Sequence, residues 1–355
     1  MSKYRFEQIV FNSTEKKKPV EEDKYTYLGL EHLDSGSLHV TRYGSDVAPI
    51  GEKLLMREGD VLFGKRRAYQ KKVAVAPFDG IFSAHGMVLR PKEEVIDKDF
   101  FPLFISSDYF LDAAIKISVG SLSPTINWRD LKELEFELPD LDKQRELAKV
   151  LWAMEATKKS YQNLLLKTDE LVKSQFIEMF GTESDKKDDC EYVALSDLCD
   201  KDSSNISLKS VEGISGEYPL YGAAGLMQYI DGYKMEKGYI AIIKDGAGVG
   251  RVYCLPAFSS IINTMQYIIP SNDVNIRYLE NLLRYMELGN DNTGSTIPHI
   301  YFKDYSKRIV PKPNIELQEK FAAFIQQSDK SKLELEQALA ELVATYKKII
   351  SENLG

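Results

Sequence analysis

The chain has 355 residues, of which 43% are hydrophobic and 28% charged, and its formal net charge is −8. This length exceeds one small domain, the composition is ordinary for a soluble globular protein, and no apolar run is long enough to span a membrane. The N-terminus lacks the apolar core of a signal peptide, and three cysteines without metal-ligand spacing indicate reduced thiols, so we expect a cytoplasmic chain. The acidic total argues against a simple basic nucleic-acid binder, so a role with DNA must depend on local charge.

The part of the chain before Asp140 is expected to form a mixed α/β domain. Short apolar runs bounded by turn residues predict strands at Tyr25–Leu30, Asp60–Phe63, Val73–Ala76 and Met87–Leu89. The helical spacing of apolar side chains predicts a helix over about Phe100–Ile115. A loop rich in Gly, Ser and Pro follows, Gly120–Ile126.

The most basic segment of the chain lies between two of the predicted strands, at Gly64–Lys72, with five positive charges in nine residues. Lysine and arginine neutralise phosphate, and the forks of arginine and glutamine also read guanine and adenine edges. A solvated hairpin is the structural alternative. The candidate DNA contacts in this segment are Lys65, Arg66, Arg67, Tyr69, Gln70, Lys71 and Lys72.

The loop after the predicted helix carries short polar groups that can bond phosphates or base edges. The candidates are Ser121, Ser123, Thr125 and Asn127. A structural loop that leads into the next helix is an equal alternative. We expect Trp128 to anchor this loop in the core, and His85, just before a predicted strand, is a further candidate.

Two long amphipathic segments are copies of one another. The first begins after Pro139 and ends at Gly181; the second begins after Pro313 and ends at Gly355, so one constant shift carries each end of the first onto the second. The shift pairs apolar positions at the seam spacing of packed helices. These pairs are Leu147 with Phe321, Leu151 with Ile325, Tyr161 with Leu335, Leu165 with Leu339, and Val172 with Tyr346.

Asp140 and Asn314 suit the N-cap positions of these helices. At about 1.5 Å per residue each helix would reach on the order of 60 Å. Two such helices most simply bury their apolar stripes on each other; two separate surface helices are the alternative.

The part of the chain between the long segments repeats the first domain after a polar linker, Thr182–Asp189. A second constant shift matches Gly59, Lys65, Val73, Pro77 and Pro91 with Gly238, Lys244, Val252, Pro256 and Pro270. The loop Gly294–Asp304 repeats Gly120–Asp130 at the shift that relates the long segments. We therefore expect four parts, 1–139, 140–181, 182–312 and 313–355, that alternate domain and helix.

The second copy of the basic segment, Lys244–Arg251, is less basic and rich in glycine, which would let the backbone approach a groove closely. A phosphate-binding glycine loop is rejected, because the residues after it predict a strand and not a helix. The candidate DNA contacts in this half are Lys244, Arg251, Ser295, Thr296, His299 and Tyr301, with Asn263 and Thr264 as further candidates and Phe302 as a core anchor.

This organisation resembles the specificity subunits of type I DNA restriction-modification systems over essentially the whole chain. The resemblance rests on Leu138–Ala148, Pro311–Ala322, Gly59–Lys65, Gly238–Lys244 and Tyr218–Gly225. It implies an α+β fold in which two α/β target-recognition domains are separated by an antiparallel coiled coil, with a pseudo-twofold internal duplication. The first half offers only Tyr25–Glu31 opposite Tyr218–Gly225, which indicates that the two domains read different bases.

The sequence contains neither an Asp/Asn-Pro-Pro-Tyr/Phe motif for adenine methylation nor a Gly-x-x-x-x-Gly-Lys-Ser/Thr loop. The resemblance accordingly implies a non-catalytic reader of double-stranded DNA with no metal and no cofactor of its own. It further implies two modification (methyltransferase) subunits that use S-adenosylmethionine, and restriction/translocase subunits that use ATP and Mg. Antiparallel helices would place one domain on each of two half-sites and set the spacer between them. A parallel pairing, which the connection between the helices also permits, would put both domains at the same end. The alternative is a coiled-coil adaptor with two protein-binding domains and no direct DNA role.

Overall fold

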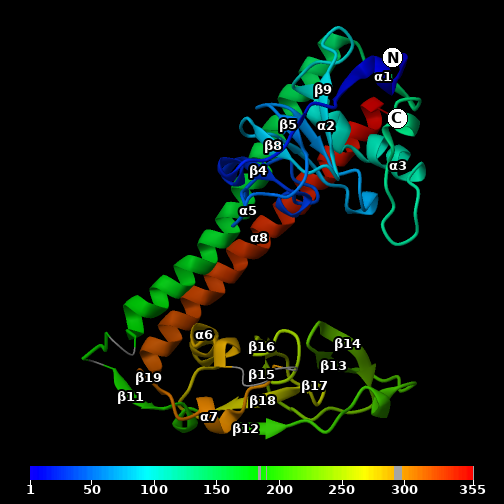
Figure 1. Cartoon of the computed structure of the whole chain (residues 1–355). Helices are drawn as coiled ribbons and strands as arrows, with labels where there is room; N and C mark the ends of the chain where they lie inside the picture. Colours follow the sequence, from blue (N-terminus) through cyan, green and yellow to red (C-terminus); the bar gives the residue numbers. More distant parts are fainter. Residues whose placement is uncertain (183–184, 189, 292–297, 355) are drawn as a thin grey trace. The chain divides into compact units, whose positions relative to one another are not determined.

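The computed structural model describes residues 1–182, 185–188, 190–291 and 298–354 (Figure 1). The backbone divides into two compact units: unit 1 is Met1–Gln162 with Gln337–Gly355, and unit 2 is Asn163–Glu336. Each long helix contributes one part to unit 1 and the other part to unit 2.

The two long helices contain 40 residues each, α5 over Leu141–Phe180 and α8 over Ile315–Leu354. Both predicted N-caps are confirmed: Asp140 Oδ1 accepts a hydrogen bond from Lys143 N, and Asn314 Oδ1 accepts one from Leu317 N, each at 2.9 Å. Gly181 follows α5 with a φ of +77°, a left-handed conformation in which glycine commonly ends helices.

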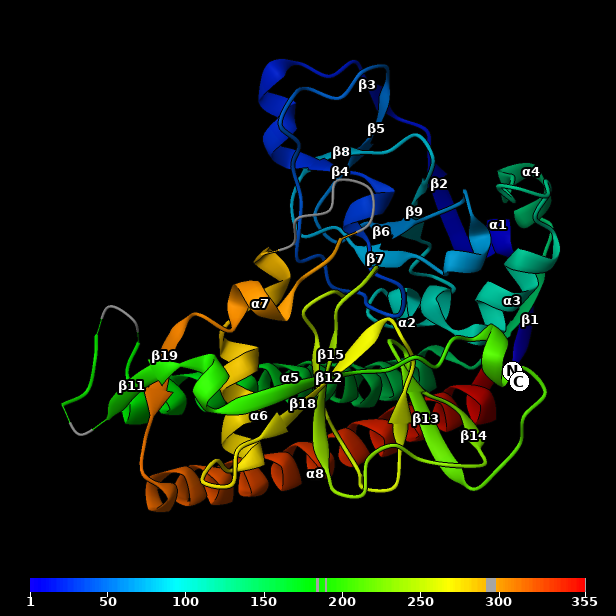
Figure 2. The ribbon, with the colours of Figure 1, turned by 90° about the horizontal axis from the view of Figure 1, so that it is seen from below.

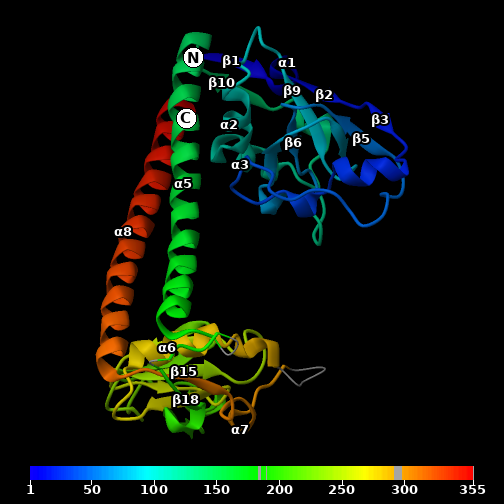
Figure 3. The same ribbon diagram turned by 90° about the vertical axis from the view of Figure 1, so that its left-hand side faces the viewer.

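Within each unit the two helices run in opposite directions. In unit 1 the end of α8 lies beside the first part of α5 (Figure 3). Leu147 near the start of α5 shares a hydrophobic core with Ile350 and Leu354 at the end of α8. In unit 2, the ring of Phe180 at the end of α5 lies 5.2 Å from the ring of Phe321 near the start of α8. The predicted antiparallel coiled coil is therefore confirmed.

The predicted seam residues are buried to different degrees along the helices. Those near the two helix starts are at most 6% exposed, because the adjoining domain also covers them: Leu147, Leu151, Phe321 and Ile325. Tyr346 packs against the core of unit 1, and Val172 against that of unit 2. The remaining four are half-buried: Tyr161, Leu165, Leu335 and Leu339. Burial of the seam is thus greatest where helices and domain meet.

Unit 1 is built on two four-stranded sheets. One has the order β2 (Val10–Ser13), β9 (Met87–Pro91), β6 (Val61–Phe63), β7 (Val73–Val75). The other has the order β3 (Lys16–Lys17), β5 (Lys53–Met56), β8 (Gly80–Phe82), β4 (Tyr27–Leu28). In addition, β1 (Ser2–Arg5) pairs antiparallel with β10 (Glu135–Leu138), which leads into α5.

The helices of unit 1 besides the long ones are α1 (Phe6–Ile9), α2 (Phe100–Ser106), α3 (Asp108–Lys116) and α4 (Trp128–Leu131). The prediction of one continuous helix over about Phe100–Ile115 is wrong at Ser107. This residue is extended, and its side chain accepts a hydrogen bond from Phe110 N and so starts α3 anew.

The predicted strand Tyr25–Leu30 is also wrong over most of its length. Residues Glu21–Thr26 form a 3-10 helix, and only β4 is paired as a strand. The Asp23 carboxylate explains the difference, because its Oδ2 accepts a hydrogen bond from Val20 N at 2.8 Å and closes the turn.

Unit 2, several of whose strands are labelled in Figure 2, repeats the strand order of the first sheet of unit 1. One sheet has the order β12 (Cys199–Ser203), β18 (Met265–Pro270), β15 (Tyr239–Ile243), β16 (Val252–Leu255). A second has the order β14 (Gly225–Ile230), β13 (Tyr218–Gly222), β17 (Ser260–Ile261). The strand before α8 is β19 (Ile309–Lys312), paired with β11 (Glu191–Ala194), and the short helices are α6 (Ile276–Tyr285) and α7 (Phe302–Tyr305).

The structure supplies the counterpart of Tyr218–Gly225 in the first half. Strand β13 pairs parallel with β17, with Leu220 opposite Ser260, and β4 pairs parallel with β8, with Tyr27 opposite Ile81. Ile81 and Ser260 are related by the same shift that carries Gly59 onto Gly238. The short strand β4 is therefore the spatial equivalent of β13, although the two sequences share little.

A buried glutamine fixes each long helix to its domain in the same way. Gln144 Oε1 accepts a hydrogen bond from Asp97 N at 2.8 Å, and its Nε2 donates to Val95 O and Pro139 O. At the equivalent position of α8, Gln318 Oε1 accepts one from Asn275 N at 2.7 Å, and its Nε2 donates to Asp273 O and Pro313 O. Both side chains are 1% exposed.

Candidate nucleic-acid interface

Three loops that lie far apart in the sequence meet beside the end of β6 in unit 1. Ile126 N donates a hydrogen bond to Lys65 O at 2.9 Å, which joins the loop before α4 to the basic segment. Arg66 N donates to His85 O at 3.3 Å, which adds the turn before β9. The two predicted loops and the further candidate His85 therefore form one surface.

Side chains continue this junction outward. The guanidinium of Arg66 donates from Nε to Ser123 Oγ at 3.1 Å and from Nη1 to His85 Nε2 at 3.3 Å. Burial, followed by the positive charges of Arg66 and Lys65, lowers the pKa of His85. A low pKa favours the neutral imidazole, whose Nε2 can accept this hydrogen bond.

The same three loops meet in unit 2 through equivalent backbone bonds. Ile300 N donates to Lys244 O at 3.1 Å, and Asp245 N donates to Thr264 O at 3.3 Å. A third bond runs from Gly246 N to Pro298 O at 2.9 Å. The duplication thus extends from the sequence to the geometry of the candidate surface.

The middle of the basic segment of unit 1 forms a turn with two strained backbone conformations. A 3-10 turn over Ala68–Gln70 is bracketed by Arg67 (φ +55°) and Lys71 (φ +48°), two left-handed residues other than glycine. Arg67 and Tyr69 are exposed, whereas Lys65 is half-buried and burial lowers its pKa. Gln70 is also half-buried, and its backbone oxygen accepts a hydrogen bond from Ser35 Oγ.

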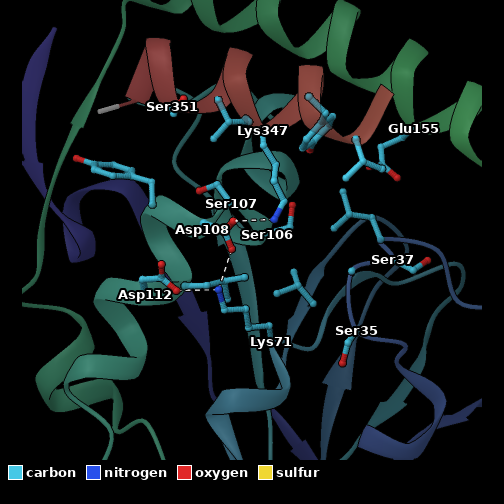
Figure 4. Close-up of a pocket in the computed structure, with 18 of the residues that line it drawn as sticks. Ser35, Ser37, Lys71, Ser106, Ser107, Asp108, Asp112, Glu155, Lys347 and Ser351 are labelled. Atoms are coloured by element: carbon cyan, nitrogen blue, oxygen red, sulfur yellow. Dashed lines mark hydrogen bonds and ion pairs between the residues drawn. The ribbon is translucent and has the colours of Figure 1, made fainter. Parts of the chain in front are cut away.

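The last two lysines of the segment, Lys71 and Lys72, bind other groups of unit 1, and Figure 4 shows the contacts of Lys71. Lys71 Nζ donates to the carboxylates of Asp108 and Asp112 at 2.8 and 2.7 Å. Lys72 Nζ donates to Leu30 O at 2.6 Å. Lys71 lies on the wall of a cavity of about 1050 Å³ in unit 1, where α3 faces the last turns of α8. Lys71 and Lys72 are therefore paired with groups of unit 1 other than those that Arg66 contacts.

The loop before α4 presents side chains of mixed character. Ser121 and Asn127 are exposed, and the backbone of Thr125 pairs with that of Val119. Trp128 packs against the core of unit 1, and Phe302 against that of unit 2, so both predicted anchors are confirmed. Leu122, which sequence reasoning passed over, is 94% exposed in the same loop.

The candidates of unit 2 gather around a glycine-rich turn. Gly246, Gly248 and Gly250 have φ near +85°, a conformation that favours glycine, and Arg251 after them is exposed. The His299 ring lies 4.0 Å from the ring of Tyr301, which is 48% exposed, while Lys244 is half-buried. Ser295 and Thr296 lie outside the described residues.

Within the described ranges, no group of three or more His, Cys, Asp or Glu side chains is placed to hold a metal ion. The same ranges contain no helix that is both long enough and apolar enough to cross a membrane. Hydrogen-bond donors and acceptors with exposed cations are the groups that read phosphates and base edges.

Comparison with known families agrees with the duplicated surface. The family model described as "Type I restriction modification DNA specificity domain" matches twice, over residues 10–166 and 187–344. The chain belongs to this family. Its two matched segments each contain one set of the three meeting loops.

A protein from Escherichia coli is similar in sequence to about half of this chain. The chain is 26% identical over 185 residues to the type I restriction enzyme EcoDI specificity subunit of Escherichia coli. That alignment covers 50% of this chain and 41% of the relative, so the chain matches less than half of the relative's length.

Two solved structures share the fold. A chain described under "Structural basis underlying complex assembly and conformational transition of the type I R-M system" has a TM-score of 0.63 and 19% identity, and the match covers 99% of this chain and 97% of that one. The type I restriction-modification S subunit from M. genitalium has a TM-score of 0.62 and 15% identity, with 100% and 96% covered.

Proposed function

We propose that the chain is the DNA sequence-specificity subunit of a type I restriction-modification complex, in which each unit reads one half of an asymmetric bipartite target. One observation carries this proposal. In both units the same backbone bonds bring three loops together, while the side chains on those loops differ between the units. A shared frame with different side chains is what two readers of different bases require.

We propose further that the catalytic steps belong to partner subunits. Two methyltransferase subunits would supply S-adenosylmethionine chemistry, and restriction/translocase subunits would supply ATP- and Mg-dependent steps. The family membership supports such an assembly, and the chain's place in the cell would be the cytoplasm. The length of α5 and α8 would set the number of unread base pairs in the target.

The competing function is a coiled-coil adaptor that never meets DNA, which the net charge of −8 favours. A gel-shift experiment separates the two: the full chain and its modification subunit are mixed with randomised double-stranded DNA over a range of salt concentrations. We expect sequence-selective retention by the complex and no methylation by the purified chain alone. If the complex shows no sequence preference at any salt concentration, only the adaptor remains.

A further inference from the structure

The positions of Arg66 in unit 1 and Asp245 in unit 2 are structurally equivalent but opposite in charge. Each follows the lysine whose carbonyl oxygen accepts from the loop isoleucine, Ile126 or Ile300. Each also donates its own N–H, at 3.3 Å in both units, to a carbonyl oxygen of the turn before β9 in unit 1 or β18 in unit 2. The side chains of Arg66 and Asp245 are therefore attached to equivalent positions of the two backbones.

Unit 1 presents hydrogen-bond donors at this position. The Arg66 guanidinium has five N–H groups, and its contacts with Ser123 and His85 use two of them. The side chain is exposed, so the remaining donors face outward. This is the group that pairs bidentately with guanine O6 and N7.

Unit 2 presents acceptors at the same position. His299 Nδ1 donates a hydrogen bond to Asp245 Oδ1, and the side chains of His299 and Asp245 are 23% and 33% exposed. A carboxylate only accepts, so Nδ1 carries the proton of this hydrogen bond, and Oδ2 of Asp245 is a further acceptor. The nearest positive charge, Lys244 Nζ, lies 4.0 Å from Asp245 Oδ2.

A purely structural role for the Asp245–His299 pair would be to hold the two loops together. The comparison with unit 1 argues against that role. Thr125 stands where unit 2 has His299, and the backbone bridge between the loops forms with Arg66 in the position of Asp245. The loops therefore close without an acid–histidine pair.

The charge of Asp245 also excludes the commonest role of a loop residue on DNA. A carboxylate is repelled by phosphates, so at a DNA surface it contributes only by accepting from a base edge. In the major groove, the base donors are the exocyclic amino groups N4 of cytosine and N6 of adenine.

We infer that Asp245, positioned by His299, is a specificity-determining residue that reads an exocyclic amino group in the half-site of unit 2, whereas Arg66 reads guanine from the equivalent position in unit 1. The inference rests on the proposed function, because it requires both units to contact bases. The two half-sites then differ in hydrogen-bond polarity at the equivalent base position.

The test selects DNA from a fully randomised duplex library with the complex of full chain and modification subunits, and sequences what is retained. Wild type, Asp245→Ala and the control Glu236→Ala are compared; exposed Glu236 precedes β15 and Asp245 follows it. We expect Asp245→Ala to lose about tenfold in preference at one base pair of one half-site, which corresponds to one lost base contact. Retention of non-selected DNA should stay the same or rise, because a negative charge has been removed.

A second variant keeps the inference testable if Asp245→Ala does not fold. His299→Thr installs the residue that unit 1 uses at this position, and should weaken preference at the same base pair. If wild type selects a sequence but both variants keep every base preference, the inference is overturned and the proposed function stands. If wild type selects no sequence, the inference and the proposed function are both contradicted. A loss of selected and non-selected binding together would show a structural role and overturn the inference.

Discussion

Arg66 donates a hydrogen bond from Nε to Ser123 Oγ at 3.1 Å, which joins two side chains that lie far apart in the sequence. The contact places a cation from the basic segment and a hydroxyl from the loop before α4 on one surface. Groups that are held in place lose less conformational freedom on binding, so such a junction favours recognition of one geometry.

Replacement of Arg66 and Arg67 by alanine should weaken the retention of target DNA by the complex several-fold, because it removes one base-reading fork and one phosphate contact. Filter binding of a duplex with both half-sites measures the loss. The control is Arg57→Ala, since Arg57 precedes β6 and lies at the opposite end of this strand. Equal losses for the control and the double variant would remove Arg66 and Arg67 from the interface.

Lys71 and Arg67 should behave differently, although the sequence places them in one basic segment. Lys71 is paired with Asp108 and Asp112, so Lys71→Ala should change DNA affinity by no more than about twofold. Arg67→Ala should lower the slope of log affinity against log salt by about one unit, which is the effect of one phosphate contact. A salt titration of both variants checks this, and a reduced slope for Lys71→Ala would contradict it.

The two buried glutamines should contribute equally to stability. Gln144→Ala leaves the N–H of Asp97 and the carbonyl oxygens of Val95 and Pro139 without their partner, and Gln318→Ala does the same in unit 2. Each variant should lose about 3 kcal/mol in the free energy of unfolding.

Urea denaturation of the full chain measures these losses, with Gln326→Ala as the control because Gln326 is exposed on α8. A change below about 0.5 kcal/mol in either buried variant would show that the glutamine does not fix helix to domain.

Cys199 should resist alkylation in the native protein. Burial raises the pKa of its thiol to about 12, so the nucleophilic thiolate is scarce at pH 8 and the sulfur is also out of contact with solvent. Iodoacetamide treatment at pH 8 followed by mass spectrometry should show labelling of Cys199 only after unfolding. Rapid native labelling at pH 8 would contradict this environment.

The sequence predicts the parts of the fold that depend on local spacing and on the duplication. The long helices begin at the predicted caps, because Asp140 and Asn314 satisfy the first backbone N–H groups locally. The strands that follow Arg66 and Arg251 in the sequence are also predicted from local patterns. The structure has β7 and β16 at these two places.

The features that escaped sequence analysis depend on contacts between distant residues. The sequence predicts Lys71 as a DNA contact, and it does not show that the fold brings the carboxylates of α3 to this lysine. Ser107 interrupts a strongly apolar helical segment through a single capping bond, which the periodicity does not show. The equivalence of Arg66 and Asp245 emerges only when the backbone bonds of the two units are compared.

A selection from a randomised duplex library tests the bipartite reading most directly. The complex of this chain with its modification subunits retains part of the library, and the pattern of retained bases is determined by sequencing. The predicted result is two specified blocks separated by unspecified base pairs, of which Arg66→Ala with Arg67→Ala weakens preference in one block and leaves the other unchanged. A single continuous block, or equal loss in both blocks, would contradict the assignment of one half-site to each unit.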